Sequence, residues 1–315
     1  MKGLSGLGNG LGNGLLKEII NDTKREELNV LYAQLRQGGE VKDEYKRAVN
    51  KTRLNTFSVS KSVVSAGFGI AADEGLLDID EKICDAFEEY LPKNPSESLL
   101  ETRVRHLLTM TTGLKESLFF CDNPERYMVK DWIKYFFDAE FDHAPGERFL
   151  YSNFNTYILS CLIEKRAGVN LLEYLRDRLF EPIGIGNPDW TLCPKGHVHA
   201  ANGLYFNIDE MGRFGEMLLR YGEYDGKRIV PEKYLKEATV KQTESPGEFG
   251  SACLNRGYGY QFWMTPIPDT FLCYWNYGQY CLVMPKKDTV ISVISFEGFN
   301  YQKILDIIVK YAAEI

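Results

Sequence analysis

Strand-like alternation of apolar and polar residues occurs at both ends of the chain. Residues 29–36 alternate, and a Gln-Gly-Gly-Glu turn joins them to a second short strand pattern at 41–45, which predicts a β-hairpin. Three further strand patterns, typical of a meander, lie near the C-terminus at 271–275, 280–284 and 289–296. Helical patterns at 15–28 and 301–314 flank these strands. We therefore expect one sheet that is completed by the N- and C-terminal segments.

The middle of the chain, from residue 73 to about 250, has the spacing of helices separated by long loops. Helical patterns occur at 103–113, 155–166, 171–179 and 208–220. The first residues repeat Gly, Leu and Asn in a low-complexity run whose glycines disfavour regular structure. The expected organisation is a flexible Gly-rich arm at 1–14, an α/β lobe formed by 15–72 and 251–315, and a helical lobe at 73–250.

Ser58 and Lys61 lie at the start of a segment whose apolar residues recur at helical spacing. Residues i and i+3 are neighbours on a helix, so the hydroxyl and the amine project side by side. A serine hydroxyl becomes a good nucleophile when a base takes its proton. A lysine can be that base only if burial or nearby cations keep it largely neutral, because its free pKa is about 10.4. A Ser-x-x-Lys spacing is expected about once by chance in a chain of this length, so the rest of the sequence must supply the context.

The sequence Tyr151-Ser152-Asn153 follows a Pro-Gly loop at the mouth of a predicted helix. If Tyr151 lies beside Ser58 and Lys61, adjacent ammonium charge would lower the pKa of the phenol and make it a possible general base. The Asn153 amide is suited to orienting Lys61 and a substrate amide. The structural alternative is that Tyr151 is a core aromatic residue and Asn153 a helix N-cap.

Composition excludes several classes of protein. The chain has 315 residues, 44% hydrophobic and 26% charged, with a net charge of -7, so the electrostatics do not support nucleic-acid binding. The seven cysteines are odd in number and scattered, which argues against a disulfide framework, and free thiols favour a reducing compartment or an anaerobic source. The sequence contains no apolar run long enough for a membrane span and no signal-peptide core at its start. We expect a cytoplasmic protein; the sequence does not indicate its oligomeric state.

Several short motifs together resemble the serine β-lactamase-like hydrolases, which include AmpC-type β-lactamases, DD-peptidases and related esterases and amide hydrolases. The motifs occur in the family's order across residues 29–315: 57–62 (Phe-Ser-Val-Ser-Lys-Ser), 73–77, 104–113, 145–146 followed by 151–153, and 278–280. The resemblance implies an α+β fold of the β-lactamase/transpeptidase type, with an antiparallel sheet flanked by helices and an all-helical lobe, and a site at the junction of the lobes.

The same resemblance implies roles for four residues. Ser58 would be the nucleophile, Lys61 its base partner, Tyr151 a proton shuttle and Asn153 an orienting group. No cofactor or metal is implied, and the partner would be a small-molecule or peptide-like substrate. The cluster of Cys193, His197 and His199 offers only three visible ligands, so a loop with incidental histidines is favoured over a zinc site.

The chain departs from the family at its third motif. Members usually carry Lys-Thr-Gly or a similar sequence on the strand beside the cleft, whereas the corresponding residues here are Cys273-Tyr274-Trp275, followed by Asn276. This segment has no cation for a substrate carboxylate, and Trp275 stands where glycine is usual. Backbone N–H groups of Ser58 and Asn276 could still form an oxyanion hole. We expect Trp275 to narrow the cleft, so that it accepts a small or apolar acyl group or has weak activity.

The favoured interpretation is a serine hydrolase that cleaves an ester, amide or β-lactam carbonyl through an acyl-enzyme on Ser58. The alternative is a catalytically impaired relative that binds a ligand or peptide in the same cleft. Trp275 and the missing cation favour the alternative, and the complete set of Ser58, Lys61, Tyr151 and Asn153 favours the enzyme.

Overall fold

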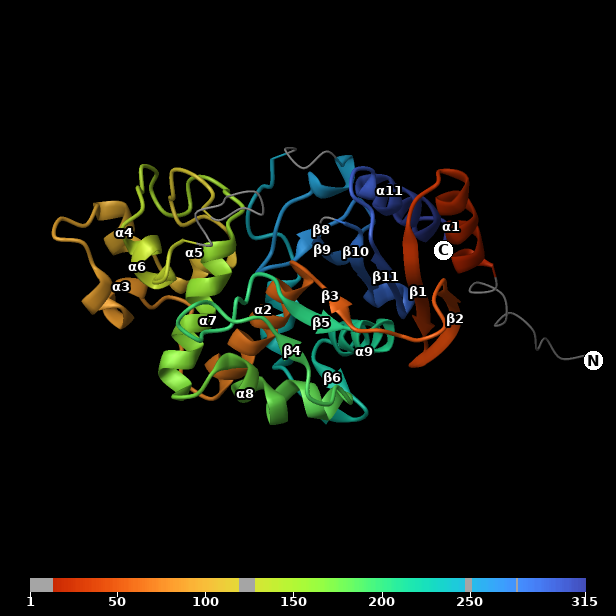
Figure 1. The fold of residues 1–315 in the computed structure, drawn as a ribbon, viewed down its shortest axis with the longest axis horizontal. Helices are drawn as coiled ribbons and strands as arrows, with labels where there is room; N and C mark the ends of the chain where they lie inside the picture. Colours follow the sequence, from red (N-terminus) through yellow and green to blue (C-terminus); the bar gives the residue numbers. More distant parts are fainter. Residues whose placement is uncertain (1–13, 119–127, 247–250, 276) are drawn as a thin grey trace, which may run out of the picture.

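A computed structural model describes residues 14–118, 128–246, 251–275 and 277–315 of the chain. Residues 1–13 of the expected Gly-rich arm, and Asn276 of the expected oxyanion hole, lie outside the described residues. Figure 1 shows the strands and the two terminal helices at one end of the molecule and the short helices of the middle segment at the other. The N-terminal and C-terminal segments meet in the same layers, as the strand patterns predict.

The main sheet has six strands in the described residues, in the order β2-β1-β11-β10-β9-β8, and all neighbouring pairs are antiparallel. The strands are β1 (Val30–Gln37), β2 (Glu40–Lys46), β8 (Trp263–Met264), β9 (Phe271–Trp275), β10 (Gln279–Met284) and β11 (Thr289–Ser295). The hairpin turn between β1 and β2 places Gly38 and Gly39 at φ 63° and 79°, a conformation that glycine adopts without strain. Pairing of β1 with β11 joins the two ends of the chain, which confirms the predicted antiparallel sheet.

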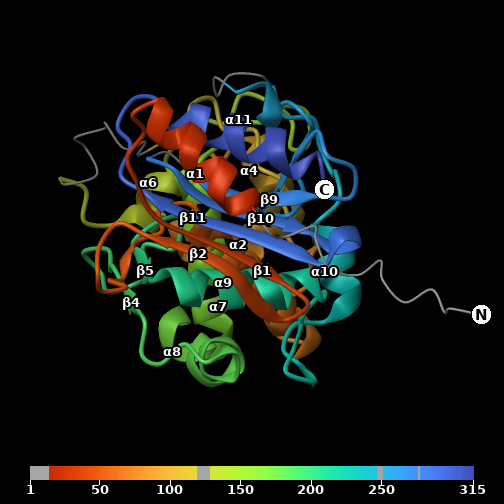
Figure 2. The ribbon, with the colours of Figure 1, turned by 90° about the vertical axis from the view of Figure 1, so that its right-hand side faces the viewer.

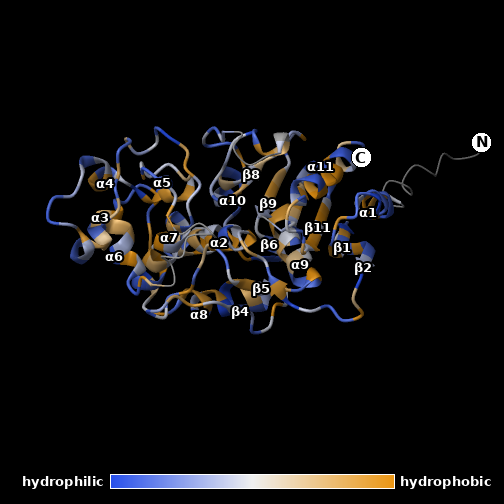
Figure 3. Cartoon of the chain, turned by 45° about the horizontal axis from the view of Figure 1, so that its top comes forward, coloured by the Kyte–Doolittle hydropathy of each residue, from blue (hydrophilic) through white to orange (hydrophobic). Residues whose placement is uncertain are grey.

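Helices cover both faces of this sheet (Figure 2). Helices α1 (Leu15–Arg25) and α11 (Tyr301–Ala312) pack together on one face. Helices α9 (Ile208–Leu219) and α2 (Val59–Asp73) contact the strands from the other face. Strands β9 and β11, which lie between these layers, are predominantly hydrophobic (Figure 3) and are buried along their whole length. The α+β class predicted from the sequence is therefore confirmed.

Helix α9 lies in the segment 73–250, yet it packs against β1, β10 and β11. Two glycines on its inner face permit this close approach. A Cβ atom on Gly215 would lie 2.6 Å from Cys281 Sγ, and one on Gly212 would lie 2.4 Å from Gln34 Oε1. The amphipathic pattern of 208–220 predicts a helix but not its packing partner, so only the tertiary structure reveals that the middle segment also contributes a helix to the sheet.

The remaining helices form the end of the molecule that is distant from α1 and α11 (Figure 1). They are α3 (Ile83–Ala86), α4 (Glu97–Glu101), α5 (Val104–Leu108), α6 (Trp132–Phe137), α7 (Asn153–Ala167) and α8 (Leu171–Leu175); α10 (Glu232–Ala238) packs on α2. Short strands form a second sheet in the order β3 (Leu54–Asn55), β5 (Leu204–Phe206) and β4 (Asp189–Trp190), and a hairpin of β6 (Glu223–Tyr224) and β7 (Lys227–Arg228). These strands are too short to produce an alternating pattern, which is why the sequence analysis did not find them.

Helix α2 lies between the sheet and the helical part of the molecule. It contacts β9 and β10 as well as α7 and α10, and its residues from Val59 to Ala71 are all buried. The helical spacing of apolar residues after Ser58 predicts a helix here, and the structure confirms the helix and shows that it is buried. None of the helices in the described part of the chain is both long and apolar enough to cross a membrane.

The close contact of α9 with the sheet gives a test of the fold. Gly215→Ala is expected to lower the free energy of unfolding by about 1–3 kcal/mol, because the added methyl group overlaps buried atoms of Cys281 and Val290. Gly186→Ala is the control, because a Cβ there meets no atom within 4 Å, and it should change stability by less than about 0.5 kcal/mol. Thermal or urea denaturation measures both. Equal effects of the two substitutions would contradict the observed packing of α9.

Candidate active site

Ser58 stands at the N-cap position of α2, directly after a sharp turn of the backbone. Phe57 has a left-handed φ of 47°, which is unfavourable for a residue with a side chain. Asn55 holds this turn, because its Oδ1 accepts hydrogen bonds from Phe57 N (2.8 Å) and Gly203 N (3.1 Å). The backbone N–H of Ser58 does not donate to any of the described residues. It therefore remains available at the position where a substrate oxyanion would form.

The amine of Lys61 lies one helical turn after Ser58 and is 1% exposed. Its Nζ is 2.7 Å from Ser58 Oγ, 2.8 Å from Asn153 Oδ1 and 2.9 Å from Ala201 O. Burial lowers the pKa of Lys61 well below its ordinary value, because the charged form loses its hydration. A neutral amine has two N–H donors and one lone pair. It can therefore donate to Asn153 and Ala201 while it accepts the proton of Ser58.

Tyr151 and Asn153 reach the site from the N-terminus of α7. Ser152 is the N-cap of this helix and its hydroxyl accepts a hydrogen bond from Phe154 N, so Asn153 is not the N-cap that the structural alternative proposed. Asn153 is instead the first residue of the helix, with its side-chain carbonyl accepting from Lys61. The backbone carbonyl of Tyr151 accepts a hydrogen bond from Ser117 Oγ at 2.8 Å. The structure thus brings Ser58, Lys61, Tyr151 and Asn153 together from two distant parts of the chain.

The expectation that adjacent charge lowers the pKa of Tyr151 is wrong. Burial raises the pKa of Tyr151 above its ordinary value, and a side-chain hydrogen bond with Ser58 lowers it by less. The physical reason is that both side chains are buried away from water. Burial also favours the neutral form of Lys61, and a neutral amine does not lower the pKa of a neighbouring phenol. A raised pKa favours the protonated phenol, which can donate a proton or a hydrogen bond rather than act as the resting base.

Trp275 lies inside the site rather than at its edge. Its ring stacks on that of Tyr151, with centroids 5.3 Å apart and an interplanar angle of 15°, and it is 4% exposed. Trp263 also stacks on Tyr151, at 5.5 Å. Lys61 Nζ is 4.9 Å from the centre of the Tyr151 ring and 5.4 Å from that of Trp275. The aromatic rings therefore enclose the amine and leave little open space beside it.

Cys273, which corresponds to the cation of the family's third motif, is fully buried on β9. Its strand partner is Cys281 on β10, and burial raises the pKa of its thiol well above the ordinary value. A thiol is neutral when protonated and negatively charged when deprotonated, so Cys273 cannot supply the positive charge of a lysine at this position. The six cysteines that the structure describes are all free thiols.

The three residues of the candidate metal cluster, Cys193, His197 and His199, each contact a different side chain of the fold. His197 Nδ1 lies 2.6 Å from Glu164 Oε2, and Cys193 Sγ lies 3.3 Å from the Tyr157 hydroxyl. The ring of His199 packs edge-on against Trp132. In the described part of the chain, no group of three or more His, Cys, Asp or Glu side chains is arranged to hold a metal ion.

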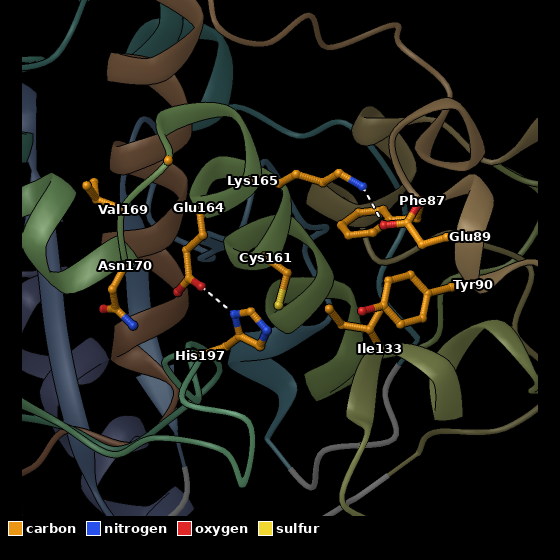
Figure 4. A pocket seen from close by; sticks show the side chains of 11 residues that line it. Phe87, Glu89, Tyr90, Ile133, Cys161, Glu164, Lys165, Val169, Asn170 and His197 are labelled. Carbon is orange, nitrogen blue, oxygen red and sulfur yellow. Dashed lines mark hydrogen bonds and ion pairs between the residues drawn. The ribbon is translucent and has the colours of Figure 1, made fainter.

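A cavity of about 390 Å³ is lined by His197 and does not include Ser58 among its lining residues (Figure 4). The Glu164–His197 pair lies on one side of it and the Lys165–Glu89 ion pair on the other. Its remaining lining is Phe87, Tyr90, Ile133, Cys161, Gly168, Val169 and Asn170. Of the site residues expected from the sequence, the five that the structure describes (Ser58, Lys61, Tyr151, Asn153 and Trp275) do not line this cavity.

Two structural contributions were missed by sequence reasoning. The carbonyl of Ala201 is a direct partner of Lys61, but a backbone oxygen leaves no signature in the sequence. The second is Gln261, a buried residue whose hydrogen bonds join α5, α7 and α2. Its side chain donates to Leu107 O and Leu108 O and accepts from Thr156 Oγ1, and its carbonyl accepts from Ser62 Oγ.

Comparison with known proteins identifies the family. A sequence profile described as Beta-lactamase matches residues 21–299, so the chain belongs to the beta-lactamase family. An uncharacterized protein of Alkalihalophilus pseudofirmus is 24% identical over 284 residues, covering 79% of this chain and 77% of that protein. The resemblance to serine β-lactamase-like hydrolases seen in the sequence motifs is confirmed.

Two solved structures show the same fold. The hydrolase EstCE1, described as having promiscuous acyltransferase activity, has a TM-score of 0.77 and 16% identity, with 95% of this chain and 98% of that chain covered. A class C beta-lactamase has a TM-score of 0.71 and 13% identity, with 97% and 96% covered. At these identities the similarity defines the fold and leaves the substrate to be argued from the site.

The burial of Lys61 generates a pH prediction. Only the neutral amine can take the Ser58 proton, so the rate of Ser58 acylation should rise with pH as Lys61 deprotonates. Because burial lowers this pKa, the rise should be complete well below pH 10.5, the ordinary lysine value. The measurement is the rate of labelling by a fluorophosphonate as a function of pH.

Lys61→Arg provides the matched control, because a guanidinium stays protonated at every accessible pH. Labelling of this variant should be slower by a factor on the order of 10² or more and should lose the rise with pH. A wild-type inflection near 10.5 would contradict a largely neutral Lys61.

Proposed function

We propose that the protein is a serine hydrolase that cleaves small acyl esters through an acyl-enzyme on Ser58. The observation that carries this proposal is the 2.7 Å contact between the Ser58 hydroxyl and a buried lysine amine whose pKa is lowered. This contact provides a nucleophile and a base that need no further group to activate the hydroxyl. Membership of the beta-lactamase family supports the same chemistry.

In the proposed reaction the Ser58 O–H gives its proton to Lys61 Nζ while Oγ forms a bond to the substrate carbonyl carbon. The resulting oxyanion lies near the backbone N–H of Ser58. Collapse of the intermediate breaks the bond to the leaving alcohol, which receives a proton from Lys61 directly or through the Tyr151 phenol. Water then attacks the acyl-enzyme, Lys61 again accepts a proton, and the carboxylic acid departs as Ser58 is restored.

The surroundings of Lys61 favour a small, neutral acyl group. Ser58 is 3% exposed, and Trp275 stacks on Tyr151 beside the amine, so the interior side of the site is narrow. The position of the family's cation is taken by the buried Cys273. A substrate with a carboxylate next to its scissile bond would therefore lose its hydration without gaining an ionic partner there.

A catalytically impaired binding protein is the second candidate function. The same burial of Ser58 and Trp275 favours it, because a closed site can retain a catalytic set without admitting an acyl donor. The two functions differ in one chemical event, the formation of a covalent bond at Ser58.

Covalent labelling tests the first proposal. Incubation with a small fluorophosphonate should add one label to the wild-type protein, seen as an increase in intact mass, because Ser58 is activated. Ser58→Ala should remain unlabelled. A wild-type protein without adduct would support the binding function, and equal labelling of both proteins would place the reactive group elsewhere.

Replacing Trp275 tests the narrowing of the cleft. Trp275→Gly should raise acylation by a penicillin, measured as adduct formation, relative to turnover of a small ester, because it removes the ring beside Lys61 and Tyr151. The change should also lower stability by about 3–5 kcal/mol, so thermal denaturation must show that the variant is folded at the assay temperature.

Trp263→Phe is the control for this experiment, because Trp263 also stacks on Tyr151. This variant perturbs the packing of the phenol but keeps Trp275, so the ratio of penicillin acylation to ester turnover should stay within about twofold of wild type. If a folded Trp275→Gly protein keeps the wild-type ratio, Trp275 does not restrict the site.

A further inference from the structure

Three aromatic side chains form a row that begins at the residue before Ser58 and ends at the protein surface. The ring of Phe57 contacts that of Tyr277, with centroids 5.1 Å apart. Tyr277 in turn stacks on Phe296, at 6.2 Å with an interplanar angle of 16°. Phe296 is 65% exposed, whereas Ser58 is 3% exposed. The aromatic row of Phe57, Tyr277 and Phe296 thus runs from the residue that precedes Ser58 in the chain to the exposed Phe296 ring.

The exposed end of the row is held in place by its backbone. Phe296 N donates to Asn29 O, and Asn29 Nδ2 donates to Phe296 O at 2.9 Å. The next residue, Glu297, donates its N–H to Tyr277 O at 3.0 Å. Hydrogen bonds therefore join the turn that carries Tyr277 to the residues that directly follow β11, Phe296 and Glu297. The Phe296 ring is therefore exposed to water, while hydrogen bonds hold the main chain on both sides of it.

A single exposed phenylalanine is ordinary on a protein surface. Phe299 is such a residue: it is 92% exposed and no ring contact joins it to the aromatic row in the described residues. Phe296 differs because it is stacked on a second ring that contacts the residue next to the nucleophile. Stacked rings that border a reactive centre present flat apolar faces, which attract other flat apolar groups.

We propose that the aromatic row binds the leaving group of the substrate, and that the protein prefers esters of aromatic alcohols with small acyl groups. This inference rests on the proposed acylation of Ser58. Trp275 and Tyr151 narrow the interior side of the site, so in this proposal only the small acyl group lies on that side. The alcohol portion then extends toward solvent, past Phe57 and along the row.

The charges near the row agree with a neutral ligand. The Glu297 carboxylate accepts hydrogen bonds from the backbone N–H groups of Asn29, Phe299 and Asn300. Burial raises the pKa of the Glu297 carboxyl, but these backbone donors lower it by more, so the negative charge is stabilised by hydrogen bonds within the protein.

In the proposed reaction the Ser58 Oγ–acyl bond forms as the bond from the carbonyl carbon to the aryl oxygen breaks. The proton from Ser58 leaves with the phenol-type alcohol.

The test compares two esters with the same acetyl group, naphthyl acetate and ethyl acetate. Phe296→Ala should lower kcat/KM for naphthyl acetate by about three- to tenfold, the size expected for one aromatic contact, and leave ethyl acetate unchanged. Phe299→Ala is the matched control and should leave both values unchanged. Equal losses for both esters, or an equal effect of Phe299→Ala, would overturn the inference.

Binding measurements separate this inference from the proposed function. In a Ser58→Ala background, which cannot be acylated at this residue, the Kd of naphthyl acetate is measured by NMR titration with and without Phe296→Ala. A weaker Kd on loss of Phe296 supports the aromatic row even if the wild-type protein takes no fluorophosphonate label, which would overturn only the hydrolase. Wild-type labelling with an unchanged Kd and unchanged ester preference would overturn the row and keep the hydrolase.

A second copy of the chain is the competing occupant of this surface. Sedimentation of the wild type and Phe296→Ala at several concentrations detects it. Association that depends on Phe296, together with an unchanged ester preference, would assign the row to self-association and overturn the leaving-group proposal.

Discussion

The interaction on which the site depends is the contact of a dry lysine amine with three oxygen atoms. Lys61 Nζ lies within 2.9 Å of Ser58 Oγ, Asn153 Oδ1 and Ala201 O, and its side chain is 1% exposed. A charged amine gains from these oxygens and from the aromatic faces beside it, but burial removes its hydration. Burial dominates, and the pKa falls. The amine can therefore act as a base because the surrounding fold excludes water.

The rest of the fold maintains this exclusion. Helix α2 carries the nucleophile and the amine between the sheet and the helices of the middle segment, so no part of its buried stretch reaches solvent. Gln261 joins α5, α7 and α2 through four hydrogen bonds of its side chain and carbonyl. Asn55 holds the left-handed turn at Phe57 that directs Ser58 into the site. The geometry of the site is thus set by polar contacts between elements that are distant in sequence.

Aromatic residues divide the site into an inner and an outer part. On the inner side, Trp275 and Trp263 stack on Tyr151 and enclose the amine. On the outer side, Phe57, Tyr277 and Phe296 lead from the nucleophile to the surface. The fold is shared with a class C beta-lactamase and with the hydrolase EstCE1. Because such different relatives keep one backbone arrangement, the side chains around the serine determine which substrates are accepted.

The sequence alone determined the parts of the structure that depend on local patterns. Strand-like sequence patterns predicted β1, β2, β9, β10 and β11 to within a few residues, because each pattern lies within a single strand. Helical spacing identified the buried helix α2 and placed the Ser58 hydroxyl beside the Lys61 amine. The order of short motifs identified the family. Each of these signals lies within a few consecutive residues or in their order along the chain.

The tertiary structure decided what depends on distant contacts and on burial. Helix α9 packs on the sheet because Gly212 and Gly215 fit there, and its amphipathic pattern would suit any apolar surface. The pKa of Tyr151 is raised rather than lowered, because its environment is dry, and no local pattern encodes the water around a side chain. The Ala201 carbonyl has no side-chain signature at all. Local periodicity thus specifies elements, while desolvation and backbone contacts, which arise only after the elements assemble, specify the chemistry.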